Sequence, residues 1–399
     1  MIMNEKESSP FTPGSPVPVE LFVGRAEQVR DLMRYVGQAA TGRQENVFLA
    51  GDRGIGKSSL AAFLRQLSAL EKNMLGIHVF LGRVTTLEEM VHHIFEQLLK
   101  ESKGESWFDD FTKFFGKYIK SIGLFGISVS FNPPQEALQE LVRKFPEAIH
   151  NLLSKIKDRK SGLFIALDDI NGLAEREEFA HWYKSFVDEV AVQYKDFPVF
   201  IVLIGLPERR DTLARLQPSL MRIFRVVEVE RLSDQEVEEF LARAFESAGM
   251  TVEQDALKIM VQFSSGLPLL MHEIGDATFW VDTDLKVDQN DAARGVFIAA
   301  EKVGQKYLDP KVYRAIRSPR YRSILRKLGK ISLSRSFSKS DVEKRLNADE
   351  QKVFHNFLRR FRELGVIEPD MEQGRGAYRF ANEIYRVYIW MESQRVKKK

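Results

Sequence analysis

Apolar residues along the chain follow two different spacings, and together these spacings predict an α/β fold. Short runs that are largely apolar are expected to be strands of a parallel sheet buried on both faces. These predicted strands are residues 46–50, 76–81, 163–167, 199–204 and 225–229. Between them, apolar residues recur every three or four positions, which is the spacing of one helix face. The predicted helices of this part are residues 26–39, 58–67, 86–101 and 135–157.

After residue 232 the strand pattern stops and the helical spacing continues. Four predicted helices, interpreted as a small helical lid, are residues 234–248, 253–263, 268–281 and 289–307. Beyond them, Ser338 is a predicted N-cap for a helix over 339–346, and Gly365 ends a stronger helix over 349–364. Two short strands then flank a glycine-containing tip, at residues 366–368 and 377–380. Helix, helix and hairpin in this order predict a winged helix.

These patterns divide the chain into five predicted parts. The first 19 residues are polar, contain four prolines among residues 1–18 and lack the apolar segment of a signal peptide, so we expect a disordered leader. The other parts are an α/β core at 20–231 with an aromatic insert at 105–135, a helical lid at 232–307, a winged helix at 308–392 and a basic tail at 393–399.

The strongest chemical signal is residues 51–58, which match the phosphate-binding pattern G-x-x-x-x-G-K-[ST] between a predicted strand and a predicted helix. The glycines let the backbone curl around an anion, and the helix start adds further N–H donors. Lys57 would reach the β- and γ-phosphates of ATP or ADP, and the Ser58 hydroxyl would bind Mg²⁺. The residues expected to hold the nucleotide here are Gly51, Asp52, Arg53, Gly54, Ile55, Gly56, Lys57, Ser58 and Ser59.

A pair of carboxylates completes the predicted site. Asp168 and Asp169 directly follow the apolar run 163–167. Asp168 is expected to hold Mg²⁺, and Asp169 is expected to orient the attacking water. Two aspartates can also simply end a strand, so this assignment depends on the P-loop earlier in the chain.

Together these motifs resemble the AAA+-type P-loop ATPases of the group that joins origin-recognition initiators with STAND signalling ATPases, over about residues 20–390. Residues 22–25 (Phe-Val-Gly-Arg) resemble the motif that lies along adenine and ribose in that group, and the resemblance implies that Val23, Gly24 and Arg25 contact nucleotide. Residues 265–269 resemble the Gly-x-Pro lid motif of STAND and NB-ARC proteins, which implies a nucleotide contact for Pro268. These families also carry a winged helix after the lid.

Two departures from that group predict slow hydrolysis. Initiator-type ATPases place an arginine in the lid to sense the γ-phosphate, whereas this chain has Pro268 there. The strand that ends at Ile204 and Gly205 also lacks the polar sensor often found at that point. Both groups would stabilise charge that develops on the γ-phosphate. ATP is therefore expected to act as a conformational switch that turnover resets.

An arginine before the last predicted strand is a candidate arginine finger. Arg222 and Arg225 stand where AAA+ proteins present such a finger to a neighbouring subunit, and Arg222 is preferred. A finger would imply a homo-oligomer with ATP at its interface. The alternative is an ordinary surface arginine near a sheet edge.

Charge is distributed unevenly along the chain. Residues 309–399 hold 23 Lys and Arg against 11 Asp and Glu, a net charge of +12, whereas the rest of the chain carries −9. Such a split suggests that the basic part meets a polyanion, although helix solubility or pairing between the two halves would also explain it. In a winged helix the second helix enters the major groove. The residues expected to face DNA are Lys352, His355, Asn356, Arg359 and Arg360, with Arg375 at the hairpin tip.

The aromatic insert at 105–135 has three possible roles: core packing of a longer helix, an interface with a protein partner or another copy, and a DNA-facing hairpin. Its aromatic residues are Trp107, Phe108, Phe111, Phe114, Phe115 and Tyr118, and residues 126–131 alternate like a strand.

The composition excludes several other classes of protein. The chain of 399 residues has no cysteine, which excludes a disulfide scaffold and thiolate chemistry and fits a cytoplasmic protein, and no apolar run has the length of a membrane span. The sequence thus favours an ATP-dependent switch or slow ATPase that couples nucleotide state to DNA binding. The alternative is a STAND-like signalling or defence ATPase whose winged helix and insert bind protein.

Overall fold

The computed structural model describes residues 6–116, 119–122, 129–331 and 336–395, and the chain forms two compact units. The first, which we call the core unit, consists of residues 18–230. The second, the C-terminal unit, joins residues 231–399 with residues 1–17. Each unit is described by itself.

The core unit is built on a five-stranded parallel sheet with the strand order β2-β5-β6-β1-β7. The strands are β1 (Glu45–Ala50), β2 (Leu75–Phe80), β5 (Leu163–Asp168), β6 (Val199–Gly205) and β7 (Arg225–Glu228). The register pairs Ala50 with Gly205 and Asp168 with Ile204, so the carboxyl ends of β1, β5 and β6 meet at one edge of the sheet. All five strands lie where the apolar runs predict them.

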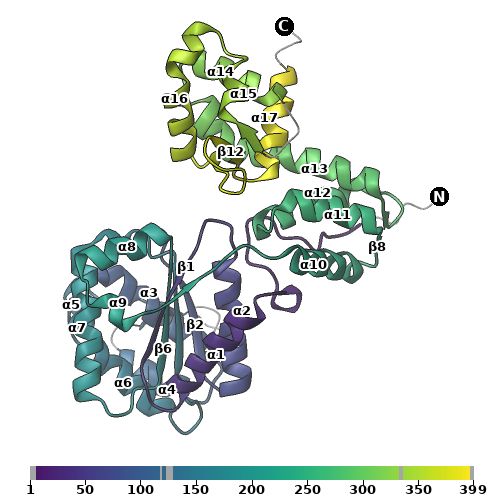
Figure 1. The fold of residues 1–399 in the computed structure, drawn as a ribbon. Coiled ribbons are helices and arrows are strands. Elements are labelled where there is room, and N and C mark those ends of the chain that lie inside the picture. The colour runs from purple at the N-terminus through teal and green to yellow at the C-terminus, as the bar shows by residue number, and fades with distance from the viewer. Residues whose placement is uncertain (1–5, 117–118, 123–128, 332–335, 396–399) are drawn as a thin grey trace. The chain divides into compact units, whose positions relative to one another are not determined.

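Helices cover both faces of this sheet (Figure 1). One face carries α1 (Ala26–Ala40) and α2 (Lys57–Lys72), and the other carries α3 (Leu87–Glu101), α6 (Phe145–Ile156) and α7 (Glu177–Gln193). The remaining helices of the unit are η1 (Val19–Leu21), α4 (Phe108–Phe115), α5 (Gln135–Arg143), η3 (Leu173–Glu175), α8 (Pro207–Leu216) and α9 (Leu220–Ile223). Burial on both faces explains why β1, β5 and β6 have no exposed residue.

One predicted helix is divided in the structure. Residues 135–157 form α5 and α6, which are separated at Lys144. Pro146 lies in the first turn of α6, where a missing N–H costs nothing, whereas inside one continuous helix it would remove a hydrogen bond.

The described aromatic residues of the insert are mostly core residues. Trp107, Phe111, Phe115 and Phe131 are at most 3% exposed and belong to the same hydrophobic cluster as α3 and α6. After α4, β3 (Ile119–Ile122) pairs antiparallel with β4 (Val129–Phe131). Tyr118 and residues 126–128 lie outside the described residues. Core packing therefore accounts for these four aromatic side chains.

The C-terminal unit begins with a helical region, followed by a smaller α/β region. Its first elements are α10 (Asp234–Ser247), β8 (Thr251–Val252), α11 (Gln254–Ser264), α12 (Pro268–Val281), β9 (Lys286–Val287), α13 (Gln289–Val303) and the π-helix η4 (Gly304–Tyr313). They are followed by α14 (Pro319–Ile331), β10 (Ser336–Ser338), α15 (Lys339–Glu343), α16 (Ala348–Glu363), β11 (Ile367–Pro369), β12 (Ala377–Phe380) and α17 (Glu383–Arg395). The last three strands form an antiparallel sheet in the order β10-β12-β11.

Two helices and one strand of this region, α14, α17 and β10, are absent from the sequence predictions. The two-helix and hairpin order of α15, α16, β11 and β12 is the order on which the winged-helix prediction rests. None of the helices in the described ranges is both long and apolar enough to cross a bilayer.

The prediction of a disordered leader was wrong for residues 6–17. Phe11 is 3% exposed and packs edge-on against Phe245 (4.9 Å between ring centroids), and the backbone N–H of Thr12 donates to Nδ1 of His272 at 3.0 Å. Lys6 forms an ion pair of 2.7 Å with Asp282. The segment has no periodicity of its own, so its partners, more than 200 residues away, were invisible in the local pattern.

Candidate nucleotide site

The loop at 51–56 takes its shape from the glycines that the sequence places in it. Gly54 and Gly56 have φ angles of 76° and 90°, a region that disfavours side chains. A Cβ on Gly51 would come within 2.9 Å of the carbonyl oxygen of Val229. Helix α2 starts at Lys57, so the backbone N–H groups of its first turn stand beside the loop. Loop and helix start together form a ready site for a phosphate group.

The side chain of Arg25 holds this loop through hydrogen bonds to its carbonyl oxygens. Arg25 is 6% exposed and adopts a φ of 58°. Its guanidinium donates hydrogen bonds to the carbonyl oxygens of Ile55 and Gly56 and, at 3.3 Å, to that of Glu230. Charged donors bind carbonyl oxygens more strongly than neutral ones, so Arg25 holds the loop in place. The predicted contacts of Arg25 and of its neighbours Val23 and Gly24 with nucleotide stay predictions.

A cavity of about 450 Å³ lies beside this motif, between α1 and α2. Its wall includes Phe22 and Phe63, whose rings are stacked at 4.3 Å between centroids. Gly24 also lines it. The motif at 22–25 therefore adjoins a cavity with a flat, apolar wall.

Lys57 is the first residue of α2 and directly follows the glycine loop. Its Nζ donates to the carbonyl oxygens of Gly51 (2.7 Å) and Asp52 (2.8 Å). Burial lowers the pKa of Lys57, and the nearby carboxylates of Asp168, Asp52 and Asp169 oppose this shift. The structure thus brings together Lys57 and both aspartates of the predicted pair. Ser58 and Ser59 are half-buried in the first turn of α2.

Asp168 has a partner that sequence reasoning missed. It is 4% exposed at the end of β5, and its Oδ2 lies 2.9 Å from Nε2 of His78 on the neighbouring strand β2. The His78 ring also stacks on Phe80 at 4.5 Å between centroids. His78 therefore holds one carboxylate oxygen of Asp168 in place. A polar residue within the otherwise apolar run 76–81 was the signal that could have revealed it.

Asn171 is a second residue that sequence reasoning missed. Its side-chain amide donates to Oδ1 of Asp169, and its own Oδ1 accepts a hydrogen bond of 3.2 Å from the N–H of Leu206. Leu206 directly follows β6, the strand that lacks a polar sensor at its end. Asp169 itself has a φ of 58°, so the turn is tight. Asn171 thus brings a polar side chain to the position where β6 supplies none.

The structure distinguishes the two candidate finger arginines. Arg225 pairs with Glu45 at 2.9 Å and lies over the ring of Tyr35 at 4.4 Å. Arg222 is exposed on α9 and forms no ion pair with any residue that the structure describes. Arg225 is therefore engaged within its own unit, and Arg222 is the better candidate to reach another molecule.

The predicted lid motif forms a tight turn in the C-terminal unit. Ser265 and Gly266 have φ angles of 52° and 68°, and a Cβ on Gly266 would come within 2.3 Å of the carbonyl oxygen of Leu232. Pro268 is the first residue of α12, where proline is favoured. The motif at 265–269 is thus a helix-starting turn, and the contact of Pro268 with nucleotide stays a prediction.

The predicted DNA-facing residues are all exposed. On α16 the residues Phe354, Phe357, Leu358 and Phe361 are buried. Their polar neighbours are all exposed and are Lys352, His355, Asn356, Arg359 and Arg360. Arg375 is exposed between Gly374 and Gly376, whose φ angles are 86° and 87°. The amphipathic prediction for this helix agrees with the observed burial.

Ion pairs within the helix neutralise part of that surface. Lys352 pairs with Asp349 at 3.0 Å, and Glu363 lies 3.2 Å from Arg360 and 4.0 Å from Arg359. A cavity of about 400 Å³ adjoins these arginines and is also lined by Arg317. One glutamate faces three arginines there, so the cavity retains net positive charge.

Part of this chain is similar to a known family. Residues 21–189 match the family described as AAA ATPase domain. A Walker-type ATPase of Pyrococcus abyssi has a similar structure, with a TM-score of 0.54 and 18% identity, covering 92% of this chain and 96% of that one. The ORC2 protein of Aeropyrum pernix, in ADPNP–ADP complexes, gives a TM-score of 0.59 at 12% identity and covers 98% and 97%. At such identities these two likenesses establish the fold alone.

One curated protein is similar in sequence. An uncharacterised HTH-type transcriptional regulator of Methanocaldococcus jannaschii is 20% identical over 278 residues. The similarity covers 65% of this chain and 64% of that protein, so the chain spans less than two thirds of the relative's length.

Proposed function

We propose that the chain is an ATP-binding switch and slow ATPase that couples its nucleotide state to DNA binding. Residues 21–189 match the AAA ATPase domain family. The observation that carries the nucleotide part is the convergence of the glycine loop, Lys57 and the two aspartates at one edge of the sheet. Three carboxylates near one partly desolvated lysine repel an anion, so a divalent cation is needed to bring triphosphate there.

Ser58 and Asp168 are the proposed Mg²⁺ ligands. Both are oxygen donors, which Mg²⁺ prefers, and His78 holds Asp168 in place. When bound, the ion would neutralise the negative charge of the phosphates. The flat wall of the cavity near Phe22 suits an adenine ring, and Lys57 would exchange its two carbonyl partners for phosphate oxygens.

Hydrolysis would depend on Asp169, which orients water, and would be slow. No arginine stands in the lid motif, and Asn171 supplies a neutral amide rather than a cation. Neutral donors stabilise developing phosphate charge less than cations do. We expect the isolated protein to turn over below about 1 per second, the lower end of typical kinase rates. A faster rate would contradict the switch proposal.

Turnover would rise if Arg222 completes the site of a neighbouring copy. Its exposure, and the engagement of Arg225 elsewhere, support this role. Specific activity should then increase with protein concentration, because dilution separates the copies. Specific activity that stays constant on dilution would remove the finger proposal and leave nucleotide binding untouched.

DNA is the polyanion that we propose for the C-terminal region. Its net charge of +12 over residues 309–399, the exposed polar face of α16 and the cavity near Arg317 support this assignment. The similarity to a protein described as an HTH-type transcriptional regulator points in the same direction. In a winged helix, α16 would lie in the major groove and the tip at Arg375 would contact the backbone.

A STAND-like signalling or defence ATPase is the second candidate. Glu363 already pairs with Arg359 and Arg360, and such neutralisation favours a helix that binds protein over one that binds phosphate. Residues 265–269 also resemble the STAND lid motif in sequence, and Ser265 and Gly266 form a turn before Pro268. In this case the winged helix would relay a signal without DNA.

Nucleotide-dependent DNA binding at several salt concentrations separates these candidates. Neutralising four to six phosphates would give a log–log salt slope of about −4 to −5. The comparison uses wild type, Lys57→Ala and the double variant Arg359→Ala/Arg360→Ala. Arg243→Ala is the matched control, because Arg243 is an exposed arginine paired at i, i+4 with Glu239 on α10.

We expect the double variant to bind DNA more weakly and with a shallower salt slope. DNA binding by Lys57→Ala should not change when ATP is added. The control should bind DNA like wild type. Absent or salt-insensitive binding by wild type would favour the signalling candidate.

A further inference from the structure

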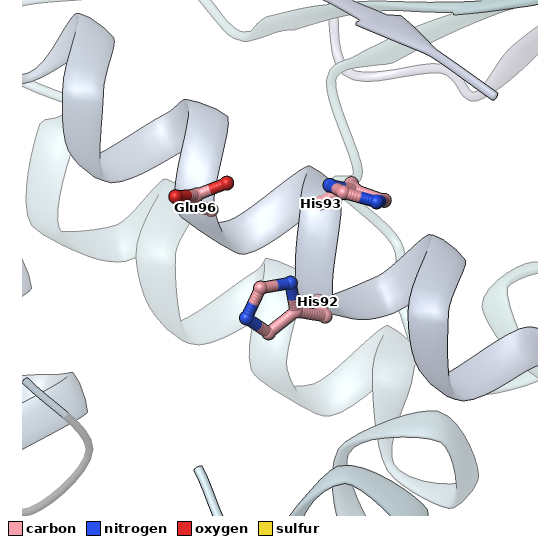
Figure 2. Close-up of side chains that lie close together, drawn as sticks. All are labelled: His92, His93 and Glu96. Carbon is pink, nitrogen blue, oxygen red and sulfur yellow. The ribbon is translucent and has the colours of Figure 1, made fainter. Parts of the chain in front are cut away.

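Two histidines and a glutamate gather on α3 (Figure 2). His92, His93 and Glu96 each offer one ligand atom, and these three atoms lie within 4.8 Å of one another. All three side chains are half-buried. In the part of the chain that the structure describes, no other group of three or more such residues meets this geometry. We propose that they bind a divalent transition-metal ion of the Zn²⁺ type.

The orientation of His92 supports this proposal most directly. Its Nε2 lies 2.7 Å from the carbonyl oxygen of Phe131 on β4. A carbonyl only accepts hydrogen bonds, so Nε2 carries the hydrogen and neutral His92 keeps its lone pair on Nδ1. Stacking of the imidazole on the Phe131 ring, at 5.5 Å between centroids, holds this orientation. Metal-binding histidines commonly donate their second nitrogen to a carbonyl in this way.

The other two ligands require small adjustments. Zn²⁺ bonds of about 2.1 Å in a tetrahedral site place donor atoms about 3.4 Å apart, so donors within 4.8 Å must each move by less than about 1 Å. Glu96 pairs through Oε1 with Lys100 at 3.1 Å, which leaves its second oxygen to bind the ion. The Lys100 side chain is 48% exposed, so it can rotate toward the solvent when the ion binds.

The ligand types select the class of ion. Two imidazoles and one carboxylate suit Zn²⁺ and its neighbours in the first transition row, whereas Mg²⁺ and Ca²⁺ prefer oxygen ligands only. Three protein ligands leave the fourth position to water. The site also differs in chemistry from the proposed Mg²⁺ site at Ser58 and Asp168, which offers oxygen atoms.

Binding would have a structural consequence for the insert. His92 joins α3 to β4 through Phe131, and Phe131 is 2% exposed in the main hydrophobic cluster. An ion that fixes the His92 ring would also strengthen this hydrogen bond. Zn²⁺ should therefore raise the melting temperature of the protein, because it binds only the folded chain.

Zn²⁺ titration of the metal-stripped full chain, without nucleotide and with excess Mg²⁺ to fill oxygen-only sites, tests this proposal. A chromophoric chelator reports free Zn²⁺. The variants are His92→Gln, which keeps a donor toward the carbonyl oxygen of Phe131, His93→Ala and Glu96→Gln. His181→Ala is the control, since His181 pairs with Glu177 at i, i+4 on α7 without a third ligand among the described residues.

We expect one Zn²⁺ per chain at micromolar concentration and a loss of at least about tenfold in affinity for each ligand variant, as even the loss of an outer partner has that effect. His181→Ala should bind like wild type. The melting temperature of each variant without Zn²⁺ shows whether it is folded. Wild type that binds no Zn²⁺ at micromolar concentration, or an equal loss in His181→Ala, would overturn the proposal. The result is independent of ATP and DNA binding.

Discussion

The loop at 51–58 and the exposed face of α16 are both predicted to bind phosphate groups, but they are built in opposite ways. The loop follows a wholly buried strand, is shaped by glycines with positive φ and is supported by the buried Arg25. The face of α16 consists of exposed side chains whose ion pairs join neighbours three or four residues apart. In the loop the fold determines the chemistry, whereas on α16 it determines only which residues are exposed.

This difference shows which kind of sequence motif identifies a function. A backbone site requires particular residues at particular positions, so few sequences without the function share it. An exposed basic face satisfies solubility, protein binding and DNA binding equally well. Substitutions should therefore have large, specific effects in the buried setting and small, additive effects in the exposed one.

The largest effect is expected from Lys57→Ala. Loss of the cation that stabilises the phosphates should lower ATP turnover by about 10²–10³-fold, because a preorganised donor in such a site contributes about 3–4 kcal/mol. Phosphate release measures this effect. Lys72→Ala, at the other end of α2, is the control and should retain wild-type turnover. Unchanged turnover in Lys57→Ala would show that the loop is not the ATPase site.

His272 extends the comparison to a buried group in the same unit as α16. Burial lowers the pKa of His272 from 6.5 to about 4, and its Nδ1 accepts a hydrogen bond from Thr12. Between these pH values the unfolded chain binds a proton that the folded chain does not. The free energy of unfolding should thus be highest above pH 6.5 and fall by about 3 kcal/mol toward pH 4.

Urea unfolding between pH 4 and 7 measures this dependence. His272→Asn keeps an acceptor for the Thr12 N–H but does not titrate, so its stability should vary less over this window. Equal pH dependence in both proteins would show that His272 is not the titrating group.

A smaller effect is expected from Asn171→Ala. Without its amide, Asp169 loses a hydrogen-bond donor and should orient water less well. We expect turnover to fall about tenfold, or about 1.4 kcal/mol, with an unchanged KM for ATP. Asn151→Ala on α6 is the control. A changed KM with unchanged turnover would place Asn171 in binding rather than in the hydrolytic step.

The smallest effect on stability is expected on α16. The double variant Arg359→Ala/Arg360→Ala should change the free energy of unfolding by less than about 0.5 kcal/mol, because exposed ion pairs contribute little. Its DNA salt slope should become shallower by about 2, one unit for each arginine that no longer neutralises a phosphate. Thermal melts and salt titrations measure the two effects. A large loss of stability would mean that these arginines support the fold rather than a ligand.

Patterns in the sequence predicted the main secondary-structure elements of the protein well. The five strands of the core sheet and helix α16 follow from local spacing, because burial on one or both faces leaves a periodic signature. The helices α7, α8, α14 and α17 and the strand β10 were missed. The strand β10 has three residues and pairs with β12, so its identity depends on a partner about 40 residues away.

By itself, the amino-acid sequence determined the phosphate loop, the two aspartates at the end of β5 and the amphipathic face of α16, because each depends on residues adjacent in the chain. Only the tertiary structure decided what holds them. His78 reaches Asp168 across 90 residues, Arg25 reaches Glu230 across 205, and Thr12 reaches His272 across 260. Such pairs leave no periodic trace, since hydrogen bonds and buried contacts depend on distance in space and not on separation along the chain.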